Sequence, residues 1–147
     1  MRVIKVEGTL DSGAEGIVAP PGVIPGPVEP SEMSSTGRGY RAANGSKIRN
    51  FGETNARFRT EDGHVCQLKF QIADLERVLI GATPLAQTGH HIVLGENGGE
   101  ILHAASGRRI ALKRRGGVYL LSMYFLVPED SQPAGAAPAA TFTRQGA

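Results

Sequence analysis

The sequence predicts a small all-β protein. Its 147 residues include 20 glycines and nine prolines, a composition that favours turns and short strands over long helices. Apolar residues make up 40% of the chain, which is enough for one modest core, so we expect a single domain with a tail. Short apolar runs are separated by Asn-Gly or Asp-Gly pairs, which are strong short-range signals for hairpins.

The first part of the chain predicts two strands and a loop. Residues 2–10 form an apolar strand that leads directly into Asp11, and residues 17–19 form a short second strand. Five prolines lie between positions 20 and 30, and proline cannot donate a backbone hydrogen bond within a central strand. Residues 20–39 are therefore expected to form an extended surface loop.

Two hairpins are expected next. Residues 40–51 turn at Asn44-Gly45, and residues 58–72 turn at Asp62-Gly63. The return arm of the second hairpin alternates apolar and polar side chains with the period of two that marks a half-buried strand. Its apolar face consists of Cys66, Leu68, Phe70 and Ile72.

The remaining elements are a strand at residues 78–81, one short helix at residues 82–88 that ends at Gly89, and further strands. Those strands are expected at residues 91–94, 100–103, 109–112 and 118–127. From residue 128 onward the composition changes to small and polar residues, so we expect residues 128–147 to form a disordered tail.

Composition also narrows the expected partners and location. The net charge of +2 is too small to indicate nucleic-acid binding through charge alone. Cys66 is the single cysteine, so no internal disulfide forms and a reducing compartment fits. The longest apolar run, residues 118–127, is too short for a membrane-spanning helix, and no signal-peptide pattern occurs at the N-terminus. We expect no membrane association and an intracellular, cytoplasmic location.

The histidine pair at residues 90–91 and the basic run at residues 108–115 are each interpreted as structural rather than functional. His90 and His91 are adjacent, and neighbouring side chains on a strand point to opposite faces, so a surface turn is favoured over a metal site. The basic run at residues 108–115 is interpreted as a solvated hairpin turn.

Asp11-Ser12-Gly13 is the strongest candidate for a catalytic site. Two carboxylates that share one proton can hydrolyse a peptide without a metal, because one takes a proton from water while the other polarises the carbonyl. The chain contains one such triplet, so a twofold dimer has to supply the second aspartate. The alternative is a plain β-domain in which Asp11 only caps an ordinary turn.

In this region the chain resembles the retropepsin-type aspartic proteases of retroviral and LTR-retrotransposon polyproteins. The resemblance covers residues 3–95 and depends on several segments taken together. They are Leu10-Asp11-Ser12-Gly13-Ala14-Glu15, Ala43-Asn44-Gly45, and Phe70-Gln71-Ile72-Ala73-Asp74-Leu75 followed by Val78-Leu79-Ile80-Gly81-Ala82-Thr83-Pro84-Leu85.

The resemblance implies an all-β closed barrel with one short helix, active as a homodimer without a cofactor or metal. It implies that Asp11 is catalytic, that Ser12 braces the pair across the twofold axis, and that Gly13 contacts the substrate backbone. A flap is expected to close over an extended segment of a polyprotein substrate. The residues expected to bind this substrate are Gly13, Ala14, Glu15, Ala43, Asn44, Gly45 and Ser46.

The same resemblance implies that Gly81 packs beneath the catalytic loop. Ala82 and Thr83 stand where members of the family carry Arg and then Asp or Asn, so the Arg-to-acid pair that braces the dimer in retroviral members is absent. A catalytically inactive domain of the same fold, which dimerises or binds peptides, is therefore the alternative function. The expected units are a protease domain at residues 1–95, additional strands at residues 96–127 and the tail at residues 128–147.

Overall fold

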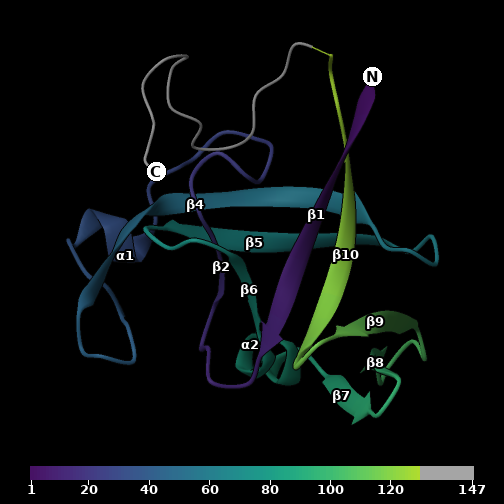
Figure 1. The fold of residues 1–147 in the computed structure, drawn as a ribbon. Coiled ribbons are helices and arrows are strands. Elements are labelled where there is room, and N and C mark those ends of the chain that lie inside the picture. Colours follow the sequence, from purple (N-terminus) through teal and green to yellow (C-terminus); the bar gives the residue numbers. More distant parts are fainter. Residues whose placement is uncertain (130–147) are drawn as a thin grey trace.

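The computed structural model describes residues 1–129, so residues 130–147 of the predicted tail lie outside the described part. The described part is mostly β, as predicted, with ten strands and two short helices (Figure 1). The strands are β1 (Arg2–Asp11), β2 (Ile17–Ala19), β3 (Gly39–Arg41), β4 (Lys47–Arg59), β5 (Val65–Ala73), β6 (Val78–Gly81), β7 (His90–Gly95), β8 (Gly98–His103), β9 (Arg109–Arg115) and β10 (Val118–Val127). The helices are α1 (Glu32–Ser35) and α2 (Ala82–Gln87). Within residues 1–129, no helix has the length and apolar character needed to cross a membrane.

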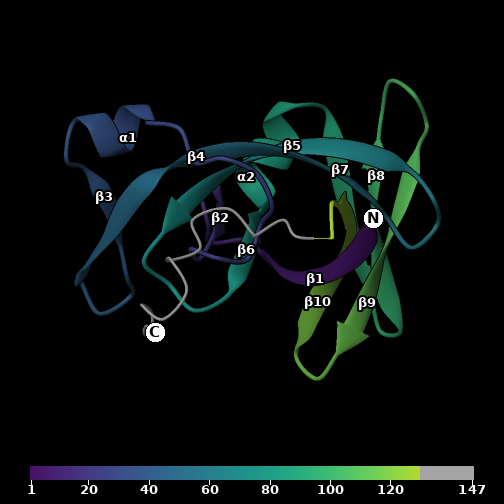
Figure 2. The ribbon, with the colours of Figure 1, turned by 90° about the horizontal axis from the view of Figure 1, so that it is seen from above.

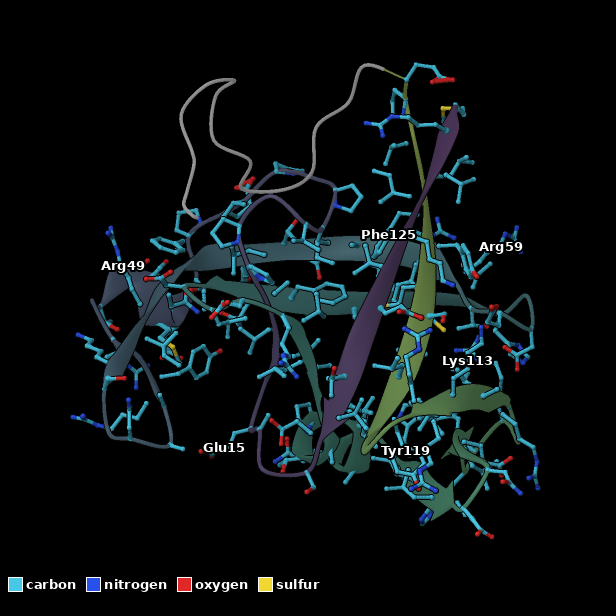
Figure 3. The ribbon with its side chains drawn as sticks, viewed as in Figure 1. Glu15, Arg49, Arg59, Lys113, Tyr119 and Phe125 are labelled. Carbon is cyan, nitrogen blue, oxygen red and sulfur yellow. The ribbon has the colours of Figure 1, made fainter. Side chains whose placement is uncertain are left out.

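Six strands close into a ring in the order β4, β5, β2, β6, β1 and β10. The ring closes where β10 returns to β4, at the antiparallel pair Tyr124 and Arg59. Next to this pair, the aromatic rings of Phe58 and Phe125 pack with centroids 5.6 Å apart. Phe125 lies where β10 crosses β4 (Figure 3). The hydrophobic core contains the largest fully buried side chains, which are Phe70, Phe125, Ile24, Ile72, Ile80 and Met123.

β6 lies between β1 and β2, although it comes much later in the sequence. It runs parallel to β1, where Asp11 pairs with Gly81, and antiparallel to β2, where Ile17 pairs with Ile80. The loop that joins β1 to β2 must therefore pass over the end of β6. This arrangement places the Asp11 triplet directly above Gly81.

Outside the ring, β9 pairs with β10, β8 pairs with β9, and β7 pairs with β8. These three strands form a layer on one side of the molecule (Figure 2). The boundary expected between residues 95 and 96 falls within the tight turn that joins β7 to β8, where Gly95 pairs with Gly98. β10 pairs with β1 along almost its whole length, from Arg2 opposite Val127 to Thr9 opposite Leu120. The segment at 96–127 thus contributes one strand to the ring itself.

The prediction of a single helix is wrong, because α1 forms inside the segment predicted as a surface loop. Ser31 begins the helix with a capping box: its hydroxyl accepts from the Ser34 N–H at 3.0 Å, and the Ser34 hydroxyl accepts from the Ser31 N–H at 2.8 Å. Such a pair satisfies N–H groups that have no partner within the helix. The same segment buries Ile24 completely, so part of it belongs to the core.

The two predicted hairpins share one long strand. β4 runs for 13 residues and pairs with β3 at one end and with β5 at the other. The pairing with β5 shifts register between Asn50 and Gly52, which marks a bulge. Gly52 has φ +140°, and a Cβ there would meet the carbonyl oxygen of Glu29 and the Val28 side chain. Residues 52–57 therefore continue the strand between the two segments in which hairpins were predicted.

The turns predicted at His90-His91 and at residues 108–115 lie mostly in strands in the structure. His90 and His91 begin β7 rather than forming a turn, and the His90 ring lies 4.8 Å from that of His103. Most of the basic run forms β9 rather than a turn. Three of its cations pair with carboxylates: Arg109 with Glu100, Lys113 with Glu61, and Arg115 with Glu7.

We predict that Phe125→Ala lowers the free energy of unfolding by about 3–5 kcal/mol, because it leaves a cavity where β10 meets β4. Phe125 is 2% exposed, whereas its neighbour Leu126 is 64% exposed. Leu126→Ala is the matched control and should change stability by less than about 0.5 kcal/mol. Urea denaturation followed by circular dichroism measures both values. Equal effects of the two substitutions would contradict this account of ring closure.

Candidate functional site

The Asp11 loop is a tight turn at the end of β1. The carboxylate oxygen Oδ1 of Asp11 accepts a hydrogen bond from the Gly13 N–H at 2.9 Å, and its carbonyl oxygen accepts one from the Ala14 N–H at 3.2 Å. Asp11 is half-buried, while Ser12 and Gly13 are exposed. The strand thus delivers a fixed carboxylate to the surface of the molecule.

Gly81 supports this loop from below, as expected. Its N–H donates to the carbonyl oxygen of Gly16 at 3.0 Å. A Cβ at Gly81 would stand 2.7 Å from the carbonyl oxygen of Ala14 and closer still to that of Gly16. Because both neighbours are backbone atoms, any side chain at this position would displace the loop. α2 follows β6 immediately.

The two oxygens of the Asp11 carboxylate differ in their hydrogen bonds. The loop holds Oδ1, whereas Oδ2 has no hydrogen bond from any residue in 1–129. A carboxylate oxygen of this kind can accept a proton from water or bind a protonated partner. Glu15 is exposed and points away from the ring (Figure 3), so one chain presents a single carboxylate here. The described residues also contain no cluster of three or more His, Cys, Asp or Glu that could hold a metal ion.

The predicted hairpin at Asn44-Gly45 is present between β3 and β4. Asn44 Oδ1 accepts from the N–H of Ser46 at 3.0 Å and from its hydroxyl at 2.7 Å, and Gly45 has φ +86°. Ala43, Asn44, Gly45 and Ser46 are all exposed. In Figure 1 this turn lies apart from the loop that follows β1. Within one chain, the structure therefore does not bring residues 43–46 onto Asp11.

Tyr40 connects the hairpin to the Asp11 loop, and sequence reasoning did not identify it. Its hydroxyl oxygen lies 3.3 Å from the position that a Cβ on Gly16 would occupy. Burial raises the pKa of the Tyr40 hydroxyl, and a hydrogen bond with Asn50 opposes this shift. A lone aromatic residue at the start of a predicted hairpin was the only signal available. The contact fixes the base of the hairpin beside the loop.

A separate groove lies between α1 and β4. It has a volume of about 690 Å³ and none of its lining residues belongs to the Asp11 loop. Sequence patterns did not predict this groove, because its walls come from segments that meet only in the folded chain. Its lining includes Arg38, Lys47 and Arg49 together with Glu29 and Phe51.

Comparison of the chain with protein-family models, with curated proteins and with solved structures finds no match. The function of the site therefore has to be inferred from its geometry and chemistry.

We predict that Gly81→Ala lowers the free energy of unfolding by about 1–3 kcal/mol, because the new methyl group overlaps the loop backbone. Gly117 is the matched control: it is exposed, and an added Cβ there meets nothing within 4 Å. Gly117→Ala should change stability by less than about 0.5 kcal/mol. Denaturant unfolding compares the two variants, and a neutral Gly81→Ala would show that the loop does not depend on this packing.

Proposed function

We propose that this chain is a retropepsin-type aspartic endopeptidase, active as a homodimer, that cleaves extended peptide segments of a polyprotein. The observation that carries the proposal is the Asp11 loop. A partly buried strand ends at a half-buried carboxylate, one oxygen accepts a hydrogen bond from the Gly13 N–H, and the next two residues are exposed. Such a loop leaves space for a second carboxylate beside the first.

The second carboxylate comes from the same residue of a second copy. A twofold axis beside Asp11 makes the contact self-complementary, because each loop meets the other in the same way. Ser12 lies at the exposed edge of the loop and serves as the brace between the two copies. Gly13 has no Cβ, so the substrate backbone can approach the dyad closely.

The reaction needs no group beyond water and the two carboxylates. One carboxylate removes a proton from water, whose oxygen forms a bond to the peptide carbonyl carbon. The other carboxyl group, which holds the shared proton, hydrogen-bonds the carbonyl oxygen. The C–N bond then breaks as the dyad gives a proton to the leaving nitrogen. The β3–β4 hairpin is the candidate flap over the bound peptide.

We predict that Asp11→Asn lowers the rate of peptide cleavage by at least about a hundredfold, because an amide cannot accept the proton from water. The measurement uses a library of unstructured peptides at high protein concentration, with products identified by mass spectrometry. Asp74→Asn is the matched control, since Asp74 is exposed and lies outside the loop. Cleavage retained by a folded Asp11→Asn variant would overturn the mechanism.

We predict that a statine-containing peptide inhibits the wild-type protein, because it mimics the tetrahedral geometry of the transition state. Inhibition is measured with the same peptide library, and a peptide with an ordinary amide at the same position is the control. Equal inhibition by the two peptides would show that the site does not recognise the transition state.

A second candidate function is a non-cleaving domain of the same fold that dimerises or binds peptides. The observation that favours it is the start of α2, which has no acidic residue in its first turn and no basic residue in its last. An ion pair that would brace the Asp11 loop from this helix is thus missing. Wild-type protein that dimerises but cleaves no peptide in the library would support this second function.

A further inference from the structure

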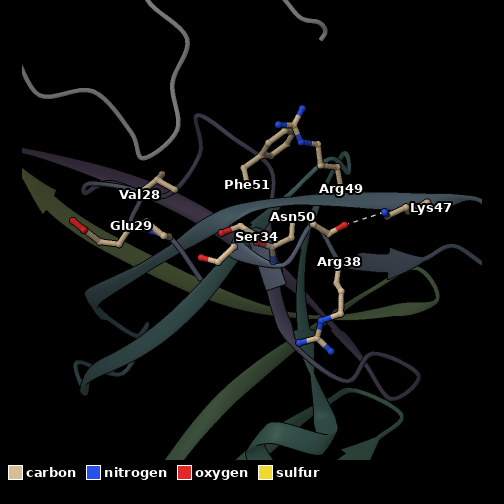
Figure 4. Close-up of a pocket in the computed structure, with 11 residues that line it drawn as sticks. Val28, Glu29, Ser34, Arg38, Lys47, Arg49, Asn50 and Phe51 are labelled. Carbon is tan, nitrogen blue, oxygen red and sulfur yellow. Dashed lines mark hydrogen bonds between the residues drawn. The ribbon is translucent and has the colours of Figure 1, made fainter. Parts of the chain in front are cut away.

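The groove between α1 and β4 combines basic side chains with one exposed aromatic ring. Lys47, Arg49 and Phe51 lie on alternate positions of β4 and are exposed. Arg38 also lines the groove, and in Figure 4 its side chain lies on the other side of the β4 ribbon from Arg49. Glu29 is the only acidic residue in the lining. The groove therefore carries an excess of positive charge.

Two of these cations have no carboxylate partner among residues 1–129. The Lys47 ammonium donates to the carbonyl oxygen of Gly37 at 3.0 Å, which leaves two of its three N–H donors available. The Arg49 guanidinium lies over the Phe51 ring, 5.0 Å from its centroid. Arg38 donates from Nε to the Thr36 hydroxyl at 3.1 Å, and its ion pair with Glu32 is long and exposed at 3.8 Å.

The cations of β9 differ in this respect. Arg109, Lys113 and Arg115 each pair with a glutamate of this chain. The fourth cation of β9, Arg114, donates to the carbonyl oxygens of Glu96 and Gly116. Carboxylates of the fold thus neutralise most of the positive charge on β9, whereas Lys47 and Arg49 in the groove have no such partner among residues 1–129. A ligand that brings its own carboxylates would complete the pairing there.

The groove is also built on a rigid base. Asn50 is 4% exposed and lies between the two outward side chains at positions 49 and 51. Its Oδ1 accepts from the hydroxyl of Ser31 at 2.8 Å, and its Nδ2 donates to Gln71 Oε1 at 3.0 Å. These bonds join β4 to the N-terminus of α1 and to β5. The outward side chains therefore start from a fixed backbone, which lowers the entropic cost of binding.

We propose that this groove binds an acidic, extended peptide segment with carboxylates on alternate residues. Alternate residues of a strand are separated by roughly 6.7 Å, so a peptide that runs along β4 repeats its side chains at the interval from Lys47 to Arg49. Its carboxylates then meet those two cations in turn. The proposal does not rest on the function of Asp11, which lies outside the groove.

Single-stranded nucleic acid fits the groove less well. Proteins that bind it use free aromatic faces for base stacking, and Arg49 covers a face of Phe51. Glu29 in the lining would also repel a continuous row of phosphates. A peptide avoids this repulsion, because it can place neutral residues opposite Glu29.

The test is the affinity of the full chain for a short fluorescent peptide with Glu on alternate residues, measured by fluorescence anisotropy at low salt. We expect binding that weakens with added salt. The peptide with Gln in place of every Glu should bind at least about tenfold more weakly, since charged partners make the stronger hydrogen bonds. Lys47→Ala and Arg49→Ala should each weaken binding by about fivefold.

Arg57→Ala is the matched control, because Arg57 is exposed on the same strand but does not line the groove. It should leave the affinity unchanged, as should Asp11→Asn. Three results would each overturn the proposal: equal binding of the Glu and Gln peptides, equal effects of Arg49→Ala and Arg57→Ala, or tighter binding of a single-stranded RNA than of the Glu peptide at the same salt. Weaker peptide binding by Asp11→Asn would also overturn it, because the peptide would then occupy the Asp11 site.

Discussion

The close packing of Gly81 against the Asp11 loop constrains the rest of the molecule. β6 can lie between β1 and β2 only if the loop that joins them passes over its end, and the carbonyl oxygens of Ala14 and Gly16 then approach Gly81 too closely for any side chain. This packing fixes where β1 ends and therefore where Asp11 lies. The proposed chemistry depends on that position, because two carboxylates can share a proton only if each loop holds its own in place.

The Asp11 loop and the groove between α1 and β4 are built on strands of the same sheet. Tyr40 packs beside Gly16 at the start of the β3–β4 hairpin, and Asn50 of β4 accepts a hydrogen bond from Ser31 at the N-terminus of α1. The Asp11 loop and the basic groove are thus separate surfaces built on shared strands. Under the two proposals, the groove holds an acidic peptide segment while the proposed dimer acts on another segment at the Asp11 dyad.

Sequence reasoning located the elements whose signals are local. The alternation in β5, the Asn44-Gly45 turn and the apolar strand before Asp11 depend on neighbouring residues, and all three are present. The groove and the contact of Tyr40 with Gly16 depend on tertiary packing, which no short-range pattern reports. α1 was missed for another reason: the prolines around it favour a loop, while its capping box has serine where the familiar pattern has Glu or Gln.

The central claim is that two Asp11 loops meet at a twofold axis, and a cross-link tests it most directly. Ser12 is exposed beside Asp11, so Ser12→Cys in a Cys66→Ser background places one thiol near the proposed axis. A disulfide needs Cα atoms about 4.4–6.8 Å apart. The account predicts rapid oxidation to a covalent dimer, much faster than for the exposed control Ser35→Cys. Equal cross-linking rates for the two variants would contradict it.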